Sequence, residues 1–161
     1  PGIHAFPSNP DFVLILDEIK DPGNMGTILR TAAAAHTQMV IVTPGCVDVY
    51  SPKVLRAGMG AHFSLPVIAM TWPEILQKLK EQKDPTGLYL AESSQGKSIW
   101  KTDLTKPAWI IIGGEAEGAG AEARKAATEM VMIPMPGKSE SLNAAIAAGI
   151  ILFEVVRQRT K

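Results

Sequence analysis

Six short apolar runs, spaced along almost the whole chain, limit the folds that this sequence can adopt. The runs are continuously apolar, without the alternation that marks a strand with one wet face, so they predict a sheet that is buried on both sides. They are Phe12–Leu16, Met39–Thr43, Pro66–Met70, Leu88–Ala91, Trp109–Ile112 and Met130–Ile133. Helices are predicted between and after them at Asn24–His36, Ser51–Gly58, Trp72–Gln82, Ala119–Glu129 and Ser141–Arg159. This alternation indicates an α/β fold, with a mostly parallel sheet and helices on both faces.

Two other segments have weaker signals. The interval 93–106 is predicted to be a long loop with one short extended piece. Residues 1–11 contain three prolines, a glycine and an asparagine, which is typical of the end of a linker. We therefore expect residues 12–161 to form one domain that belongs to a longer protein.

Charge and cysteine content exclude several classes of protein. The chain has 16 basic and 16 acidic residues, whereas a dedicated nucleic-acid-binding domain normally has a basic excess. No apolar run approaches the roughly 18 residues that span a bilayer, so we expect no membrane partner. The single cysteine, Cys46, excludes an internal disulfide and fits a reducing compartment, so we expect a cytoplasmic protein in which Cys46 is a buried or half-buried bystander.

Three predicted strand ends carry unusual residues, and ligands of open parallel sheets bind at the carboxyl ends of the strands. After the first run, Pro22 and Gly23 shape a turn and Asn24 can cap a helix that carries Arg30. After the fifth run come the paired glycines 113–114. The last run stops at prolines, and Ser141 or Asn143 then opens a helix rich in small residues. The stretch 133–149 is typical of a binding site built from main chain.

Two motifs with known chemistry lie in the wrong context. Residues 118–123 fit a relaxed dinucleotide fingerprint, but that fingerprint normally opens the first βαβ unit and has an acid at the end of the next strand. Residues 91–98 fit a loose P-loop, but a poor helix follows them, and a P-loop must open a helix. A Rossmann-type domain therefore stays only as an unfavoured alternative. The histidines lack the spacing of metal ligands, and we expect no metal.

Taken together, the three strand ends resemble the SpoU (TrmH-like) branch of the SPOUT RNA methyltransferases. The motif N-x-G-x-x-x-R matches at Asn24, Gly26 and Arg30, and G-x-E-x-x-G matches at Gly113, Glu115 and Gly118. The motif I-P-M-x-G-x-x-x-S-L-N matches at Ile133, Pro134, Met135, Gly137, Ser141, Leu142 and Asn143. All three motifs occur in the family's order.

The resemblance implies a deep C-terminal trefoil knot, a homodimer, and methyl transfer from S-adenosylmethionine to a ribose 2′-hydroxyl of RNA. It implies catalytic roles for Arg30, Asn24, Glu115, Ser141 and Asn143. It implies cofactor binding by Gly113, Gly114, Gly118, Ile133, Met135, Gly137, Ser141 and Leu142. A non-catalytic knotted scaffold that binds cofactor or RNA is the alternative.

The resemblance also raises the question of the RNA partner. Many relatives carry a separate N-terminal RNA-binding domain, and we expect that domain to be missing from this sequence. We therefore expect the chain to bind S-adenosylmethionine but to methylate RNA poorly by itself. Ribosomal RNA is slightly favoured over tRNA as the substrate.

Overall fold

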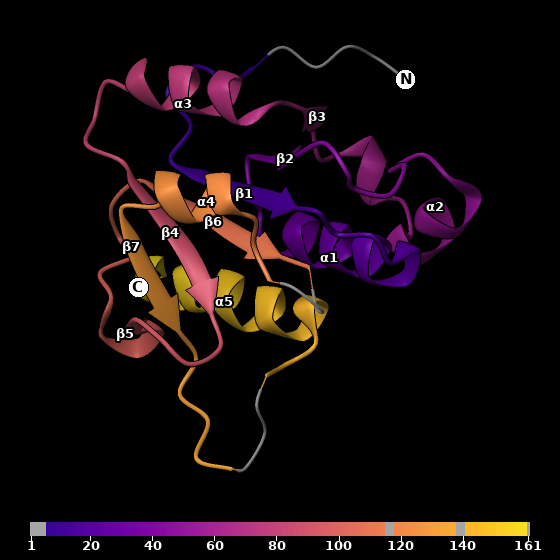
Figure 1. Cartoon of the computed structure of the whole chain (residues 1–161). Helices are drawn as coiled ribbons and strands as arrows, with labels where there is room; N and C mark the ends of the chain where they lie inside the picture. Colours follow the sequence, from indigo (N-terminus) through magenta and orange to yellow (C-terminus); the bar gives the residue numbers. More distant parts are fainter. Residues whose placement is uncertain (1–5, 115–117, 138–140, 161) are drawn as a thin grey trace.

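Seven parallel strands form one sheet in the order β3-β2-β1-β6-β4-β7-β5 (Figure 1). The computed structural model describes residues 6–114, 118–137 and 141–160. The strands are β1 (Phe12–Asp17), β2 (Met39–Val42), β3 (Val67–Ala69), β4 (Gly87–Glu92), β5 (Lys97–Ser98), β6 (Ala108–Gly113) and β7 (Glu129–Met132). The edge strand β5 is the short extended piece expected within residues 93–106. The predicted, mostly parallel sheet is confirmed.

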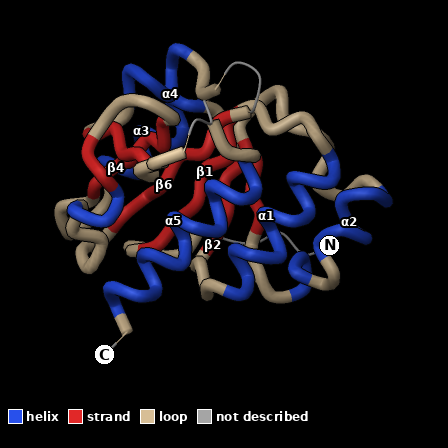
Figure 2. The backbone as a smooth tube through the Cα atoms, turned by 90° about the horizontal axis from the view of Figure 1, so that it is seen from below, coloured by secondary structure: helices blue, strands red, loops and turns tan. Residues whose placement is uncertain are grey.

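Helices cover both faces of the sheet, as predicted. They are α1 (Pro22–Ala34), α2 (Pro52–Gly58), α3 (Trp72–Lys80), α4 (Ala121–Ala126) and α5 (Ala144–Arg159), with 3₁₀ turns η1 (Ala61–Phe63) and η2 (Ile99–Lys101). Seen from below, α1 and α5 lie side by side across one face (Figure 2). Helices α3 and α4 contact each other over the opposite face.

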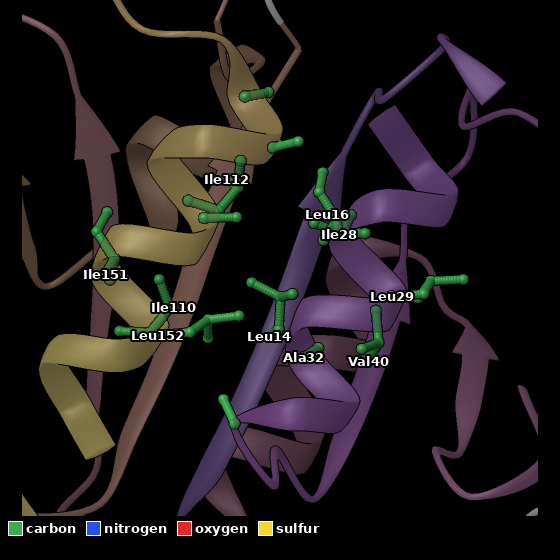
Figure 3. Close-up of a cluster of buried hydrophobic side chains, with 14 of the residues drawn as sticks. Leu14, Leu16, Ile28, Leu29, Ala32, Val40, Ile110, Ile112, Ile151 and Leu152 are labelled. Carbon is green, nitrogen blue, oxygen red and sulfur yellow. The ribbon is translucent and has the colours of Figure 1, made fainter. Parts of the chain in front are cut away.

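Each face of the sheet has its own hydrophobic core. Leu14 and Leu16 of β1 pack with α1 and α5 (Figure 3), whereas Val13 and Ile15, which alternate with them along the strand, pack with α3 and α4. Successive side chains of a strand point to opposite faces. Because both faces are covered, both sets of side chains are apolar, which explains the continuous apolar runs.

Helix α1 begins at Pro22 and not at Asn24, so the prediction that Asn24 caps this helix is wrong. Asp21 is the N-cap, and its carboxylate accepts a hydrogen bond of 2.8 Å from the Asn24 N–H. Proline suits the first helical position because the N–H that it lacks has no partner in the helix. A carboxylate and an amide are both good caps, so composition alone could not choose between residues 21 and 24.

Helix α4 ends at Ala126 and not at Glu129. Ala127 leaves the helical region with φ −59° and ψ 135°. The Thr128 N–H then donates to the Leu88 carbonyl of β4 at 2.8 Å, and Glu129 pairs with Tyr89. Pairing with a neighbouring strand therefore starts β7 earlier than local propensity indicates.

Helix α5 begins at Ala144, and the structure selects Asn143 over Ser141 as its cap. The Asn143 side chain accepts hydrogen bonds from the N–H groups of Ala145 and Ile146 at 2.8 and 3.2 Å. Most of this helix is apolar, and Ala144, Ala148 and Leu152 are buried against the sheet.

Residues 6–11 contact the domain. The Trp109 indole N–H donates to the Pro10 carbonyl at 3.1 Å, and the ring of Phe6 lies 6.1 Å from the Trp109 ring, centroid to centroid. Within the described part of the chain, no helix has the length and apolar character needed to cross a membrane.

Candidate active site

A cavity of about 350 Å³ opens where β4, β6 and β7 end. Three segments that are far apart in the sequence form its walls, because β4 and β6 are neighbours in the sheet and β7 lies beside β4. The cavity is lined by Ala91, Glu92, Ser93, Ile112, Gly113, Gly114, Gly118, Arg124, Ile133, Met135, Ser141, Leu142, Ala144, Ala147 and Ile151. Most of these residues offer only backbone groups or apolar side chains. Such a surface suits a ligand that takes hydrogen bonds from main-chain groups and apolar contact from side chains.

The turn after β6 brings two backbone segments very close together. A Cβ at Gly113 would lie 2.3 Å from the Ala119 nitrogen, so only glycine fits at that position. The Gly118 N–H donates to the Gly114 carbonyl at 2.9 Å, and Gly118 has φ +67°, a left-handed conformation that favours glycine. All three glycines line the cavity. Glu115, predicted to be catalytic, lies outside the described residues.

Asp17, at the end of β1, holds this turn in place. Its side chain is buried, and it accepts hydrogen bonds from Thr43 Oγ1 at 2.9 Å, Trp72 Nε1 at 3.1 Å and the Gly120 N–H at 2.8 Å. Its carbonyl also accepts a bond of 3.2 Å from the Gly114 N–H. One buried carboxylate therefore connects the ends of β1 and β2, the start of α3 and the start of α4.

Sequence reasoning missed Asp17. A possible signal was an acid directly after a buried apolar run, because a buried carboxylate requires hydrogen-bond donors. The donors themselves could not be identified, because they lie 26, 55 and 103 residues away along the chain.

The segment after β7 supplies the opposite wall of the cavity. Ile133, Met135, Ser141 and Leu142 line it. Gly137, also predicted to bind the cofactor, is exposed and is not among the lining residues, and a Cβ there would meet nothing within 4 Å.

Asn24 and Asn143 meet at the rim formed by α1 and α5. The Asn143 side-chain amide donates to Asn24 Oδ1 at 3.1 Å, which joins two of the predicted catalytic residues across 119 positions of sequence. Arg30 lies further along α1, is exposed, and does not line the cavity.

The glycine of the first motif has a packing role. A Cβ at Gly26 would lie 2.4 Å from the Cβ of Ala57 in α2, and 2.7 Å from the Val54 carbonyl oxygen. Only glycine therefore lets α1 and α2 approach so closely.

The structure accounts for the other candidate sites in the sequence. The Gly120 N–H, which a dinucleotide phosphate would need, is bonded to Asp17. Lys97 and Ser98 form β5 and open no α-helix, so the P-loop reading is excluded. Cys46 is half-buried, as expected; its thiol donates to the Leu16 carbonyl at 3.3 Å, and burial raises its pKa. Within the described ranges, no group of three or more His, Cys, Asp or Glu side chains is placed to hold a metal ion.

Comparison with known proteins supports the resemblance. The sequence profile of the SpoU rRNA Methylase family matches residues 11–153. An uncharacterised tRNA/rRNA methyltransferase of Synechocystis sp. is 40% identical over 149 residues, which are 91% of this chain and 53% of that protein. The 23S rRNA (guanosine-2′-O-)-methyltransferase RlmB of Xylella fastidiosa is 39% identical over 149 residues, which are 92% of this chain and 59% of that protein. The chain thus spans a little over half the length of these relatives.

A solved structure has the same fold. The SpoU methyltransferase AviRb from Streptomyces viridochromogenes, in complex with the cofactor AdoMet, superposes with a TM-score of 0.91 at 34% identity. The superposition covers 99% of this chain and 63% of AviRb. Because the profile covers most of the sequence, the three motifs stand in the family's order and the fold superposes on a SpoU enzyme, this chain belongs to the SpoU rRNA methylase family.

Proposed function

We propose that this chain is the catalytic domain of an S-adenosylmethionine-dependent methyltransferase that modifies a ribose 2′-hydroxyl of RNA, with ribosomal RNA as the preferred class. The observation that carries the proposal is the cavity at the ends of β4, β6 and β7, whose walls contain residues of two family motifs. The third motif adjoins it through the hydrogen bond between Asn24 and Asn143. The names of RlmB, a 23S rRNA 2′-O-methyltransferase, and of AviRb, solved with AdoMet, support this substrate class and this cofactor.

The residues present fit the cofactor. A cavity of about 350 Å³ is within the usual range for small-molecule sites. Gly113, Gly114 and Gly118 expose main chain on one side, and Ile133 and Leu142 offer an apolar slot with main-chain groups on the other. Adenosine needs these two kinds of surface: hydrogen bonds to its ring edge and apolar contact on its faces. Direct contact by Gly137 or Glu115 stays a prediction.

Bound S-adenosylmethionine supplies a methyl group on a sulfonium, which is already a good leaving group. The protein therefore chiefly aligns the acceptor 2′-hydroxyl and removes or shares its proton. Arg30 is exposed on α1, where its side chain is accessible to a partner. An arginine guanidinium stays protonated at neutral pH, so it makes a poor proton acceptor and a good bidentate partner for a phosphate. We therefore assign Arg30 to orientation of the target nucleotide, while Asn24, Ser141 and Asn143 line the approach to the 2′-hydroxyl.

The functional unit in this proposal is a homodimer. Ile146 and Phe153 lie seven residues apart on α5 and are 55% and 45% exposed, which is costly in water for large apolar side chains. The neighbouring helix α1 presents Thr27 and Arg30. A second copy that covers this face would bring the Arg30 of one subunit toward the cavity of the other.

Two further expectations belong to the proposal. The trefoil knot implied by the resemblance stays a prediction, because the segment that would thread includes residues 138–140, outside the described ranges. The cytoplasm is the compartment that we propose, which a single half-buried thiol without disulfides permits.

Two measurements test the function. Calorimetry of the purified chain with S-adenosylmethionine should show saturable binding at one site per subunit, and absence of binding would overturn the proposal. Single-turnover assays with methyl-labelled cofactor should place the label on ribose 2′-oxygens of ribosomal RNA fragments in preference to tRNA. Label on a base would exclude the proposed reaction. Because we expect the chain to methylate RNA poorly by itself, only cofactor binding with a complete absence of transfer to any RNA would favour the scaffold alternative.

A further inference from the structure

Two oppositely charged side chains stand in a cavity that is otherwise lined by backbone, apolar and hydroxyl groups. They are Glu92, at the carboxyl end of β4, and Arg124, on α4, and they are the only charged residues among the described lining. Neither belongs to the three family motifs. A charged pair inside a small-molecule site contributes orientation and specificity, since the apolar walls already provide contact area.

The carboxylate is the deeper member of the pair. The Glu92 side chain is 14% exposed and the Arg124 side chain is 40% exposed. Strand β4 lies between β6 and β7, so Glu92 sits between the glycine turn on one side and the segment that begins at Ile133 on the other. A ligand in the cavity therefore lies within reach of this carboxylate.

Glu92 has one oxygen in use. Its Oε1 accepts a hydrogen bond from Arg124 Nη1, and within the described ranges Oε2 accepts none. The Glu92 side chain is partly exposed, so solvent can reach this second oxygen when no ligand is bound. A carboxylate oxygen is a strong acceptor, and it can exchange such a water for a donor that the ligand brings.

The charge of the pair indicates which donor that is. S-adenosylmethionine offers this carboxylate three kinds of donor, namely the two neutral hydroxyls of its ribose, its cationic ammonium group and the exocyclic amine of its adenine. The guanidinium of Arg124 already balances the charge of Glu92, so an ammonium gains little net attraction and adds a like charge near Arg124. The ribose hydroxyls and the adenine amine carry no such repulsion, and of these only the two vicinal hydroxyls can donate to one carboxylate from two separate atoms.

We infer that Glu92 binds the ribose cis-diol of S-adenosylmethionine and that Arg124 is a positioning residue that holds the Glu92 carboxylate toward it. The inference rests on the proposed function, because it assumes that this cofactor occupies the cavity. It adds a recognition element that is specific to this chain's own charged pair.

Calorimetry on the Glu92→Gln variant tests the inference. Hydrogen bonds to a charged group are worth more than neutral ones, so we expect binding of S-adenosylmethionine to weaken by about 10- to 100-fold. The same factor is expected for 5′-methylthioadenosine, which keeps the ribose but has no amino acid. For 2′,3′-dideoxy-5′-methylthioadenosine the variant and the unchanged chain should bind equally, because the groups that Glu92 contacts are absent.

Other outcomes overturn the inference. An equal loss with the dideoxy ligand would mean that Glu92 contacts the adenine amine or that the substitution disturbs the pocket as a whole. A loss with S-adenosylmethionine but none with 5′-methylthioadenosine would mean that Glu92 reads the ammonium group. Unchanged binding of every ligand would remove Glu92 from the site, although binding by the unchanged chain would still support the cofactor assignment.

Two further variants serve as controls. Glu122→Gln removes a carboxylate from the exposed first turn of α4, outside the cavity lining, and should change no affinity. Arg124→Lys keeps the positive charge but loses the planar guanidinium, and should weaken ribose-containing ligands by a smaller factor than Glu92→Gln. Equal thermal unfolding of the ligand-free variants shows that they are folded.

Discussion

The α3–α4 layer and the α1–α5 layer cover opposite faces of one sheet, yet their outer surfaces differ. Helix α3 begins with a capping box, in which Thr71 and Glu74 bond each other's backbone, and ends with Lys78 and Lys80. Helix α5 carries Ile146 and Phe153 on its exposed side. The outer surface of α3 is therefore polar, whereas the second layer has exposed apolar side chains on α5 and the exposed Arg30 on α1, which we propose orients the RNA. This difference indicates that a partner surface lies on the α1–α5 side.

The largest effect on the methylation rate is expected from substitution of Arg30. We expect Arg30→Ala to lower the methylation rate by about 100-fold or more, because the target would lose its orientation. Cofactor affinity should change by less than about 2-fold, because Arg30 does not line the cavity of its own subunit. Single-turnover rates and calorimetry separate the two quantities.

Arg30→Lys separates positioning of the phosphate from proton transfer. Lysine keeps the charge but lacks the planar pair of donors, so RNA binding and rate should fall together. If RNA binding survives intact while methylation collapses, the positioning role is wrong.

Asp17 of β1 connects the start of α3 and the start of α4 to the turn that lines the cofactor site. Asp17→Asn leaves one acceptor oxygen for three donors, so we expect it to lower the free energy of unfolding by about 2–3 kcal/mol. It should also weaken cofactor binding by about 10-fold, since the turn after β6 loses its anchor at Gly120. Urea denaturation and calorimetry measure the two effects.

Thr43→Val provides the matched control for Asp17. It removes one donor to the same carboxylate but leaves the bond to Gly120. It should therefore reduce stability without changing cofactor affinity. Equal loss of affinity in both variants would show that Asp17 stabilises the fold generally and does not position the turn.

The exposed face of α5 should determine the oligomeric state. Ile146→Glu would place a carboxylate in the proposed interface, and we expect the dimer dissociation constant to rise by about 100-fold or more. Lys80→Glu, at the end of α3, changes charge on the other layer and should leave the dimer intact. A dimer that tolerates Ile146→Glu would place the interface elsewhere, and sedimentation velocity distinguishes these outcomes.

A smaller effect is expected from pH at the end of α5. Hydrogen bonds from Arg157, with a further bond from Gln158, hold the pKa of the buried Glu154 below its ordinary value. A lowered folded pKa contributes stability above the ordinary value and loses it as the pH falls through the folded value. Because Arg157 is largely exposed, the contribution should be about 1 kcal/mol. Between pH 7 and pH 3, Glu154→Gln should therefore lose less stability to acid than the unchanged chain, and an equal loss would contradict this assignment.

The smallest effect is expected on the α3–α4 layer. Thr71→Ala removes the N-cap of α3 and should reduce stability by about 1 kcal/mol. Cofactor affinity and methylation rate should stay the same, because neither Thr71 nor α3 lines the cavity. Loss of cofactor affinity would show that the two layers are not as separate as their surfaces indicate.

Most of the fold could be predicted from local patterns. Continuous apolar runs predicted six of the strands, because burial on both faces leaves that signature in the strand itself. Errors were confined to the ends of elements, as at Asp21, where two good capping residues competed. In the site, glycine and proline positions marked the segments that line the cavity, because close backbone approach and forced strand endings require those residues.

The tertiary structure alone decided which residues meet. The sequence determined an α/β domain, its family motifs and a main-chain site, since each of these depends on the residues of one segment. The partners of Asp17, the contact of Glu92 with Arg124 and the bond between Asn24 and Asn143 depend on strand order, which places β6 beside both β1 and β4. The physical reason is that a polar side chain shows its need for a partner in the sequence, but only the packed sheet determines which distant donor is close enough to satisfy it.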